Sequence, residues 1–401
     1  MTRPPEDILI LGNGLAATLL ATCLIEECAY PASNITLCAP DESIASDVPG
    51  ALMHPLPGSS LTPKPDVMLA YEASIARLTS WLERYPEYVL CSRMLRLDRG
   101  ARRGKRYLKS YANSHHLYSS HMHHELLSEE ELSHITPALS SDTRSAIAYG
   151  PTYCVALGKL LPLLREDLRV RGVKHINKKA LSVQSNTEGA TTLLLEGQAT
   201  HTTSCLVFAC GPSLPQFFPH LDLGINGGEL LVIEASAHPM DVMLSAGGHI
   251  SQMPDIEQAT QVMGSSYLRP RQGHERSTEA DAFFRHDEEA ITQIKEMIGR
   301  FSPHVHDADV AQVWRGRRTV YLPDKHPLVG RVPTMHNVFV LGALGSKGLL
   351  WAPLASTLLA RHLIPKEDAH TPDMPMACST ARVPREQWGT PSFGSQQPAS
   401  S

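Results

Sequence analysis

A glycine-rich turn near the N-terminus, in the stretch "DILILGNGLAATLLATCLIEE", constrains the fold most. Four apolar residues, Ile8–Leu11, predict a buried strand, and the Ala- and Leu-rich residues 15–28 predict a helix. Gly12, Gly14 and Ala17 form the pattern G-x-G-x-x-A between strand and helix, which is typical of dinucleotide binding. In that motif the first glycine permits a tight turn, the second lets backbone approach a pyrophosphate, and the small third residue allows close helix–sheet packing.

The second strand of this motif is predicted at Ile35–Cys38, after the turn signal of residues 31–34. In dinucleotide-binding folds an acidic residue about 20 positions after the turn holds the ribose hydroxyls. Ala39 stands where that acid is commonest, and Asp41 follows two residues late. We therefore expect the ribose contact to be shifted to Asp41 or Glu42, or to be made by a backbone group, and the motif alone does not indicate NAD.

The length of 401 residues exceeds one compact core and predicts a mixed α/β protein with two interleaved domains. Helices are predicted at residues 66–85, 158–170 and 287–299, and the C-terminal stretch "NVFVLGALGSKGLLWAPLASTLLARHLI" again reads as strand, glycine loop and helix. From about residue 366 the composition changes to Pro, Ser, Thr and Gln, which predicts a disordered tail at 366–401.

Composition excludes several classes of protein. The net charge of −5 argues against general nucleic-acid binding, and no apolar stretch reaches the ~18–20 residues of a membrane span. The start "MTRPPEDILILG" does not resemble a secretion signal, and the eight cysteines form no CxxC pair. We therefore expect a cytoplasmic protein with reduced thiols. The histidine-rich stretch "HHLYSSHMHHE" fits no standard metal spacing, so no metal site is predicted.

One basic run could contact RNA in spite of the overall acidity. Its members could follow a phosphate backbone, or they could form a solvated surface. The run consists of Arg93, Arg96, Arg99, Arg102, Arg103, Lys105, Arg106 and Lys109.

Taken together, several stretches resemble the D-amino-acid oxidase (DAO) family of FAD-dependent oxidoreductases over about residues 7–364. The resemblance rests on "TLCAPDES", "GALMHPLPG", "LVFACG" and "VMGSSYLRP", on "VWRGRRTVYLPDKHPLVGRVP", and on the closing "LGALGSKGLLWAPLASTLLARHL". Within that family the chain looks most like the FAD-dependent oxidase domain of MnmC-type tRNA wobble-uridine modification enzymes. The fold implied is a discontinuous Rossmann-like FAD-binding domain at 1–75, 146–220 and 318–365, interleaved with an antiparallel-sheet substrate-binding domain at 76–145 and 221–317. The cofactor implied is FAD, and because no Cys or His motif demands a covalent link, we expect it to be bound noncovalently.

The resemblance also implies site residues. Arg318, or its competitor Arg317, would hold a substrate carboxylate, and Tyr267 would line the substrate pocket. Glu229 departs from the family, which usually has Gln there. The cofactor-binding residues that we expect are Gly12, Gly14, Ala17, Asp41, Gly50, Ala51, Val183 (through its backbone), Ala209, Gly211, Gly345, Ser346, Lys347 and Gly348.

Three functions are compatible with these patterns. The first is oxidation of the C–N bond of an N-substituted glycine, specifically the carboxymethylaminomethyl group of a tRNA wobble uridine, which would yield aminomethyl-uridine and glyoxylate. A separate methyltransferase would then act on the product, because no such domain is recognisable in this chain. The second is a small-molecule amine oxidase of the glycine- or sarcosine-oxidase type, which would release an imine and hydrogen peroxide. The third is a non-catalytic flavoprotein that serves as a binding subunit.

Overall fold

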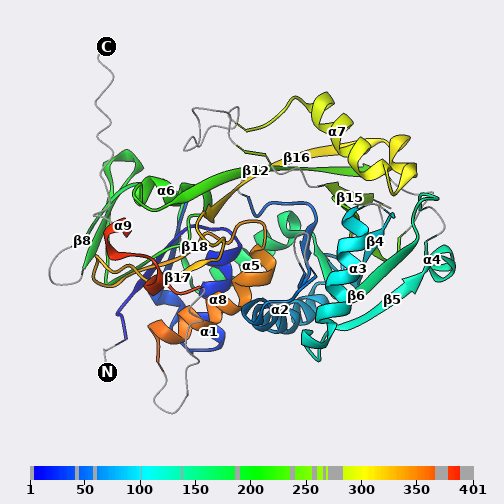
Figure 1. The fold of residues 1–401 in the computed structure, drawn as a ribbon. Helices are drawn as coiled ribbons and strands as arrows, with labels where there is room; N and C mark the ends of the chain where they lie inside the picture. Colours follow the sequence, from blue (N-terminus) through cyan, green and yellow to red (C-terminus); the bar gives the residue numbers. More distant parts are fainter. Residues whose placement is uncertain are drawn as a thin grey trace.

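The structure is a computed structural model (Figure 1). It describes residues 4–40, 45–56, 61–100, 102–136, 139–185, 190–234, 240–254, 260–264, 268–269, 283–365 and 378–388, with the side chains of 102–104 excepted. Among the helices of these ranges, none combines the length and the apolar character needed to cross a bilayer.

A six-stranded sheet carries the N-terminal motif. Its central strand is fully buried and lies parallel to its neighbours on both sides, as expected for strands that are apolar on both faces. The strand order is β17-β18-β11-β1-β2-β7. The bounds are β1 Ile8–Leu11, β2 Ile35–Cys38, β7 Lys174–Ile176, β11 Cys205–Phe208, β17 Leu328–Arg331 and β18 Val338–Gly342.

Helices and a small sheet cover the two faces of this sheet. The helices α1 (Leu15–Glu26), α5 (Leu157–Val170) and α8 (Gly348–Leu363) bury their apolar sides in one core with residues of β1 and β2. A second core contains Leu9 and Leu11 of β1 and residues of the three-stranded sheet β10-β9-β8. The bounds of that sheet are β8 Ala180–Ser185, β9 Thr191–Leu195 and β10 Thr200–Thr203.

A nine-stranded sheet, with several helices around it, forms the second main part of the molecule. In Figure 1 its long strands β12 and β16 run across the top of the molecule, with α7 (Asp287–Gly299) above them. The strand order is β16-β12-β15-β14-β13-β4-β6-β3, and β5 pairs with β6. The bounds are β3 Ala51–Met53, β4 Val89–Asp98, β5 His123–Ser128, β6 Ser145–Val155, β12 Leu223–Glu234, β13 Met243–Ser245, β14 His249–Gln252, β15 Thr260–Gly264 and β16 Val310–Tyr321.

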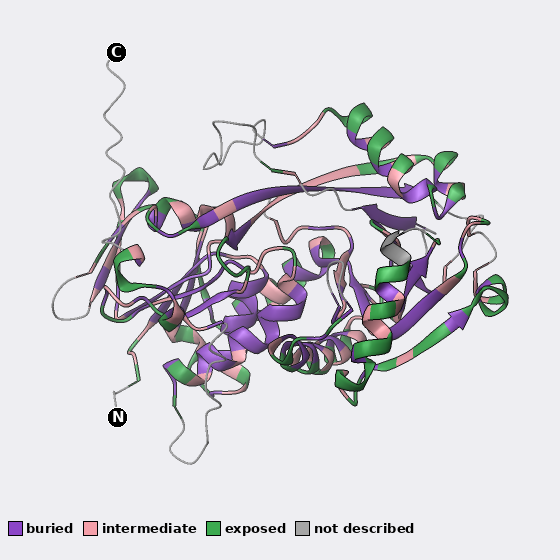
Figure 2. Cartoon of the chain, in the orientation of Figure 1, coloured by how far each residue is buried: buried purple, intermediate pink, exposed green. Residues whose placement is uncertain are grey.

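The remaining helices include α2 (Pro65–Arg84), α3 (Arg102–Ser114) and α4 (Glu129–Ile135). Figure 2 shows that burial is concentrated in the sheets and in α1 and α8, whereas α3 and α7 present exposed outer sides.

Most elements expected from periodicity are present. The first two strands have the predicted bounds, and α1, α2, α5 and α7 agree with the predicted helices to within two residues. The predicted FAD-binding domain includes residues 146–155, whereas these residues form most of β6 in the nine-stranded sheet.

The expectation of a disordered tail does not hold for residues 378–388. The backbone N–H of Val329 in β17 donates to the Cys378 carbonyl oxygen at 2.9 Å. Trp388 is 1 % exposed and packs edge-on against Phe218, with 5.5 Å between ring centroids. Because a buried indole removes much apolar surface from water, this segment is held although the composition around it is polar.

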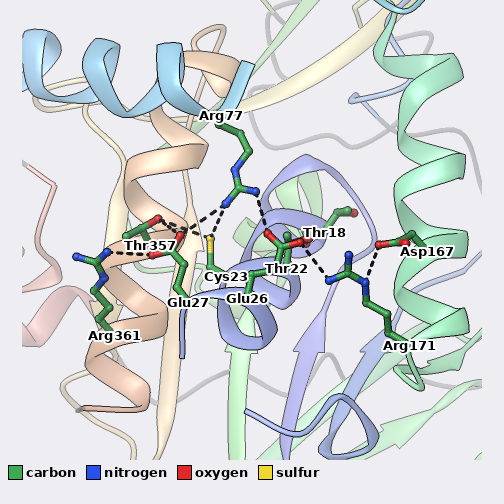
Figure 3. Close-up of polar contacts among 10 residues, drawn as sticks. All are labelled: Thr18, Thr22, Cys23, Glu26, Glu27, Arg77, Asp167, Arg171, Thr357 and Arg361. Carbon is green, nitrogen blue, oxygen red and sulfur yellow. Dashed lines mark hydrogen bonds and ion pairs between the residues drawn. The ribbon is translucent and has the colours of Figure 1, made fainter. Parts of the chain in front are cut away.

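An ion-pair network joins residues in or next to the helices α1, α2, α5 and α8 (Figure 3). Arg77 of α2 contacts Glu26 at 3.2 Å and Glu27 at 3.6 Å. Glu27 also pairs with Arg361 of α8, and Glu26 with Arg171, which follows α5. Burial raises the pKa of Cys23, which lies inside this network, to about 12, so its thiol stays protonated.

Replacing Arg77 by Met should therefore destabilise the fold. Its side chain is 18 % exposed, so two carboxylates would lose a partly buried partner. We expect the free energy of unfolding to fall by about 1–2 kcal/mol in a denaturant titration. Arg169→Met is the matched control, since Arg169 pairs with Glu166 on an exposed helix surface and its replacement should leave the free energy of unfolding almost unchanged. Equal losses in the two variants would contradict the prediction.

Candidate active site

A cavity of about 960 Å³ lies between the two main sheets. Its walls include residues that follow the carboxyl ends of the parallel strands β1, β2, β11 and β18, and residues of β4, β12, β13 and β16. In open α/β sheets, ligands bind in the crevice outside the carboxyl ends of the strands, where connections leave in opposite directions. Strand β1, flanked by β2 and β11, provides such a position here.

The glycine turn after β1 opens onto this cavity. Gly12 has φ +138° and donates its N–H to the Cys38 carbonyl oxygen at 2.8 Å. A Cβ at this position would lie 2.3 Å from the Ala209 carbonyl oxygen. Only glycine therefore permits β11 to pass so closely, and the turn leaves backbone groups of Gly12 and Gly14 on the cavity wall.

Two helix N-termini end at the cavity. Neither α1 nor α8 has an acidic residue in its first turn, so their positive dipole ends are not neutralised there. At α1 the N–H of Leu15 donates to Ser46 Oγ at 3.2 Å. At α8 the loop begins with Gly345 at φ +58°, whose N–H donates to the Thr319 carbonyl oxygen at 3.0 Å. Both ends can bind negatively charged groups, such as a pyrophosphate or an anionic ring.

The structure brings most of the sequence-predicted cofactor residues together. Ala17 does not line the cavity, because it is fully buried in the first turn of α1. Val183 of β8 is buried in the second core, and Lys179 and Ala180, four and three residues before it, line the cavity. Asp41 and Tyr267 lie outside the described residues. The predicted residues that line the cavity are Gly12, Gly14, Gly50, Ala51, Ala209, Gly211, Gly345, Ser346, Lys347 and Gly348.

Register decides which of two adjacent arginines starts from the cavity side of the sheet. Arg318 is paired with Asn226 and Arg317 with Gly227, so the two point to opposite faces. A Cβ on Gly228 would lie 2.5 Å from Arg318 Nη2, whereas one on Gly227 would meet Phe284. Because Gly228 is on the cavity side, Arg318 is the better candidate for a substrate carboxylate, although Arg317 also lines the cavity.

Gly228 makes room for the Arg318 guanidinium, so Gly228→Ala should shift that group without harming the fold. The obstructing atom is the end of a flexible side chain. We expect the KM for a carboxylate substrate to rise by about 5- to 30-fold, equivalent to about 1–2 kcal/mol, with the melting temperature little changed. Gly224→Ala on the same strand is the control, because its Cβ would meet only Leu322. Equal kinetic effects would argue against this role of Gly228.

Arg96 requires a correction of the predicted RNA-contacting surface. It is 6 % exposed, lines the cavity and donates to Ser245 Oγ at 3.1 Å and to the Leu56 carbonyl oxygen at 3.0 Å. It therefore cannot follow an external phosphate backbone. Arg93 and Arg99 are engaged in ion pairs with Glu125 and Asp142.

The rest of the basic run lies on α3. Lys105, Arg106 and Lys109 are exposed on this helix. The side chains of Arg102 and Arg103 are not among those that the structure describes. The part of the run that can meet an external partner is therefore smaller than the sequence suggested.

Two histidines on the cavity wall stay neutral at ordinary pH. Burial, with the charges of Arg96 and Lys347, lowers the pKa of His54 to about 3. Burial, with the charges of Arg96 and Arg318, lowers the pKa of His249 to about 4. His249 Nε2 has no hydrogen-bond partner within the described residues. Because His249 lines the cavity and a neutral imidazole can donate or accept, this nitrogen can form a hydrogen bond with a bound ligand.

These lowered pKa values predict loss of stability in mild acid. Between about pH 6.5 and pH 4 the unfolded chain would protonate His54 and His249 while the folded protein would not, so the free energy of unfolding falls as pH falls. Each proton contributes a slope of about 1.4 kcal/mol per pH unit at most. The double variant His54→Gln/His249→Gln should show a shallower slope in denaturant titrations between these pH values. An unchanged slope would contradict the prediction.

Sequence reasoning missed several residues of this wall. Trp314 lies over Gly316, whose Cβ would be 2.2 Å from the indole, and it faces the cavity with Leu230 and Arg318. Ser245 and His249 come from short strands without a motif, and only the alternation of inward residues could have indicated them.

Glu229, the departure from the family, lies on the opposite face of β12. It is fully buried, and it accepts from the Arg285 backbone N–H at 3.1 Å and from Arg285 Nε at 2.9 Å. Arg315 approaches it at 3.8 Å. A carboxylate replaces the expected amide here because two guanidinium groups compensate its charge.

The lining carries charges of one sign. Among the described lining residues none is acidic, and the basic ones are Arg96, Lys179, Arg315, Arg317, Arg318 and Lys347. Burial, together with Lys64, lowers the pKa of Lys347. No group of histidine, cysteine and carboxylate side chains in the described part of the chain could hold a metal ion. The cavity is suited to anionic ligands.

A glycine turn and two helix N-termini at one cavity, closed by a second sheet, are suited to a dinucleotide cofactor. The model of the FAD dependent oxidoreductase family DAO matches residues 7–362, and the chain belongs to that family. The residues fit the cofactor, because the turn after β1 leaves space for a pyrophosphate and both helix ends favour negative charge. FAD is therefore the cofactor of this protein.

Solved structures support the fold. Glycine oxidase from Geobacillus kaustophilus superposes with a TM-score of 0.74 at 16 % identity, covering 92 % of this chain and 97 % of that one. Iminodiacetate oxidase from Chelativorans sp. BNC1 gives 0.72 at 16 % identity, covering 93 % and 99 %.

A curated relative matches only in part. The tRNA 5-methylaminomethyl-2-thiouridine biosynthesis bifunctional protein MnmC of Acinetobacter baylyi is 27 % identical over 182 residues, which is 44 % of this chain. The matched part covers 27 % of that relative, so the chain spans about a quarter of its length.

Proposed function

We propose that this protein oxidises the C–N bond of an N-substituted glycine. The main support is the position of Arg318 on the face of β16 that is turned to the cavity. The described residues that line this cavity include no aspartate or glutamate. A guanidinium binds a carboxylate through two parallel hydrogen bonds, which fixes both its position and its orientation. The names of the structural neighbours, glycine oxidase and iminodiacetate oxidase, agree with a substrate that contains glycine.

The chemistry that bound FAD supplies is acceptance of a hydride from the glycine methylene carbon, after which water hydrolyses the resulting imine to an amine and glyoxylate. The chain would contribute orientation and electrostatics. Arg318 would hold the carboxylate, and the N-terminus of α8 would stabilise negative charge beside Ser346. His249, neutral in this environment, offers a nitrogen to the substrate amine.

A tRNA-linked substrate is the specific candidate. The partial match to MnmC favours the carboxymethylaminomethyl group of a wobble uridine. Lys105, Arg106 and Lys109, exposed on α3, offer cations for the RNA backbone. The aminomethyl product would require a separate methyltransferase for further modification. A free N-substituted glycine is the alternative, since the cavity itself needs no RNA.

The test is the visible spectrum of the purified flavoprotein under anaerobic conditions. Wobble-modified tRNA, glycine and sarcosine would be added in turn while the ~450 nm band of bound FAD is followed. Bleaching by any of them, with glyoxylate released, supports the oxidase. Bleaching by tRNA alone supports the RNA substrate, and the Lys105→Gln/Arg106→Gln/Lys109→Gln variant should then weaken tRNA binding and reduce its salt dependence. A flavoprotein that none of these and no other N-substituted glycine bleaches would instead be a non-catalytic binding subunit.

A further inference from the structure

The strongest feature that the proposed reaction leaves unused is the buried arginine Arg96. Its guanidinium contacts Ser245 Oγ at 3.1 Å, the Tyr149 hydroxyl at 3.2 Å and the Leu56 carbonyl oxygen at 3.0 Å. It also lies over the Tyr107 ring, 5.4 Å from its centroid. All of these partners are neutral.

Arg96 lacks a counterion in the described structure. No described residue that lines the cavity is acidic, and Arg96 forms none of the described ion pairs. Its Nε is buried without a hydrogen-bond partner in the same part of the chain. A buried cation without a negative partner costs several kcal/mol, and Arg96 lines the cavity, where an anion could compensate it.

Arg96 and Arg318 both line the cavity, and the strand register shows that several strands of the same sheet separate them. On the inner face of the sheet, Arg96 is paired with Ser245, and Ser245 with His249. His249 is paired with Gly264, and Gly264 with Leu230, two residues from the Gly228 position over which Arg318 lies. His249 thus stands between the two guanidinium groups. The charges of both affect its pKa, which agrees with this placement.

We propose that Arg96 binds a second acidic group of the substrate, so that the preferred substrate is an N-substituted glycine whose N-substituent ends in a carboxylate or phosphate. This inference rests on the proposed function. Arg318 would hold the glycine carboxylate, and Arg96 would hold the distal oxyanion together with the Ser245 and Tyr149 hydroxyls. The methylene carbon between the two acidic groups is thereby fixed in the cavity. An N-substituted glycine whose N-substituent is neutral would leave the charge of Arg96 without a negative partner.

The first experiment compares N-substituted glycines with three- and four-carbon linkers that end in an amide, a carboxylate or a phosphonate. For the holoenzyme we expect kcat/KM to favour an acidic end by about 10- to 100-fold over the amide, mainly through KM, as for one charge-assisted contact. The carboxylate and phosphonate arms identify which oxyanion is preferred. Arg96→Gln should bring the ratio of acid to amide close to one, and Arg96→Lys should restore part of it. Arg169→Gln, on an exposed helix surface, is the matched control.

The second experiment does not depend on turnover. Glutarate and its monoamide would be titrated into the flavoprotein while the flavin spectrum and the melting temperature are recorded. Wild type should bind glutarate about 10-fold or more tightly than the monoamide, and Arg96→Gln should remove the difference.

The outcomes separate the two proposals. Turnover at equal rates with acid and amide ends would overturn the role of Arg96 while leaving the oxidase intact. Arg96-dependent binding of glutarate without any turnover would sink the oxidase proposal and retain the anion subsite. If Arg96→Gln fails to fold, Ser245→Ala should still reduce the acid preference. Equal binding of glutarate and its monoamide by wild type would overturn the inference by itself.

Discussion

Arg318→Gln should raise the KM for a glycine-type substrate by about 30-fold or more. Removing one partner of a hydrogen-bonded charge pair costs about 2–5 kcal/mol. Arg318 starts from the cavity face of β16, and its Nη2 is held 3.4 Å from the Gly227 carbonyl oxygen. The loss should therefore fall on carboxylate binding, and steady-state kinetics with glyoxylate detection measures it.

Two further variants test the geometry of this contact. Arg318→Lys keeps the charge but loses the paired hydrogen bonds, so its KM should lie between those of wild type and Arg318→Gln. Arg317→Gln should have the smaller effect, because Arg317 is paired with Gly227 on the other face. A larger loss in Arg317→Gln than in Arg318→Gln would reverse the assignment.

Gly12→Ala should abolish retention of FAD. The new Cβ would lie 2.3 Å from the oxygen and 2.8 Å from the carbon of the Ala209 carbonyl, and both are backbone atoms. A φ of +138° is also strained for alanine. Because β1 and β11 must separate to relieve the clash, we expect a loss of at least about 4 kcal/mol in stability and a colourless protein. Absorbance of the purified protein and its thermal unfolding measure both effects.

Gly100→Ala separates strain from the clash. Gly100 also has a positive φ, +68°, but a Cβ there would meet no atom within 4 Å. Its replacement should cost about 1 kcal/mol and leave the flavin bound. If Gly12→Ala keeps its colour and behaves like Gly100→Ala, the close approach of β11 is not what makes glycine necessary.

The N-terminal motif could be predicted from sequence because its determinants are local. A strand buried on both faces appears as the uninterrupted apolar run Ile8–Leu11, and the glycine turn marks its end. The register of β12 and β16 was not accessible in this way. It results from pairing over many residues, and it alone separates Arg318 from Arg317.

Arg96 shows why the basic run was misassigned. Over Met94–Asp98 strand β4 is buried on both faces, although Leu95 and Leu97 alternate with Arg96 and Asp98 as in a strand that exposes its polar side. The charges around it therefore resembled an exposed surface. Trp388 illustrates the complementary error, since one aromatic anchor outweighs a polar composition in holding a segment.

The order of the six-stranded sheet has a consequence for biosynthesis. Strand β1, Ile8–Leu11, is synthesised long before its neighbour β11 at Cys205–Phe208, and β11 long before its other neighbour β18. Pairings between such distant segments form late, because long loops must close first. The N-terminus of α8 at Gly348 lines the same cavity as the glycine turn after β1, so the flavin site is complete only once α8 has been synthesised. A chain stopped before β18 would carry the glycine turn without β18 and without the N-terminus of α8.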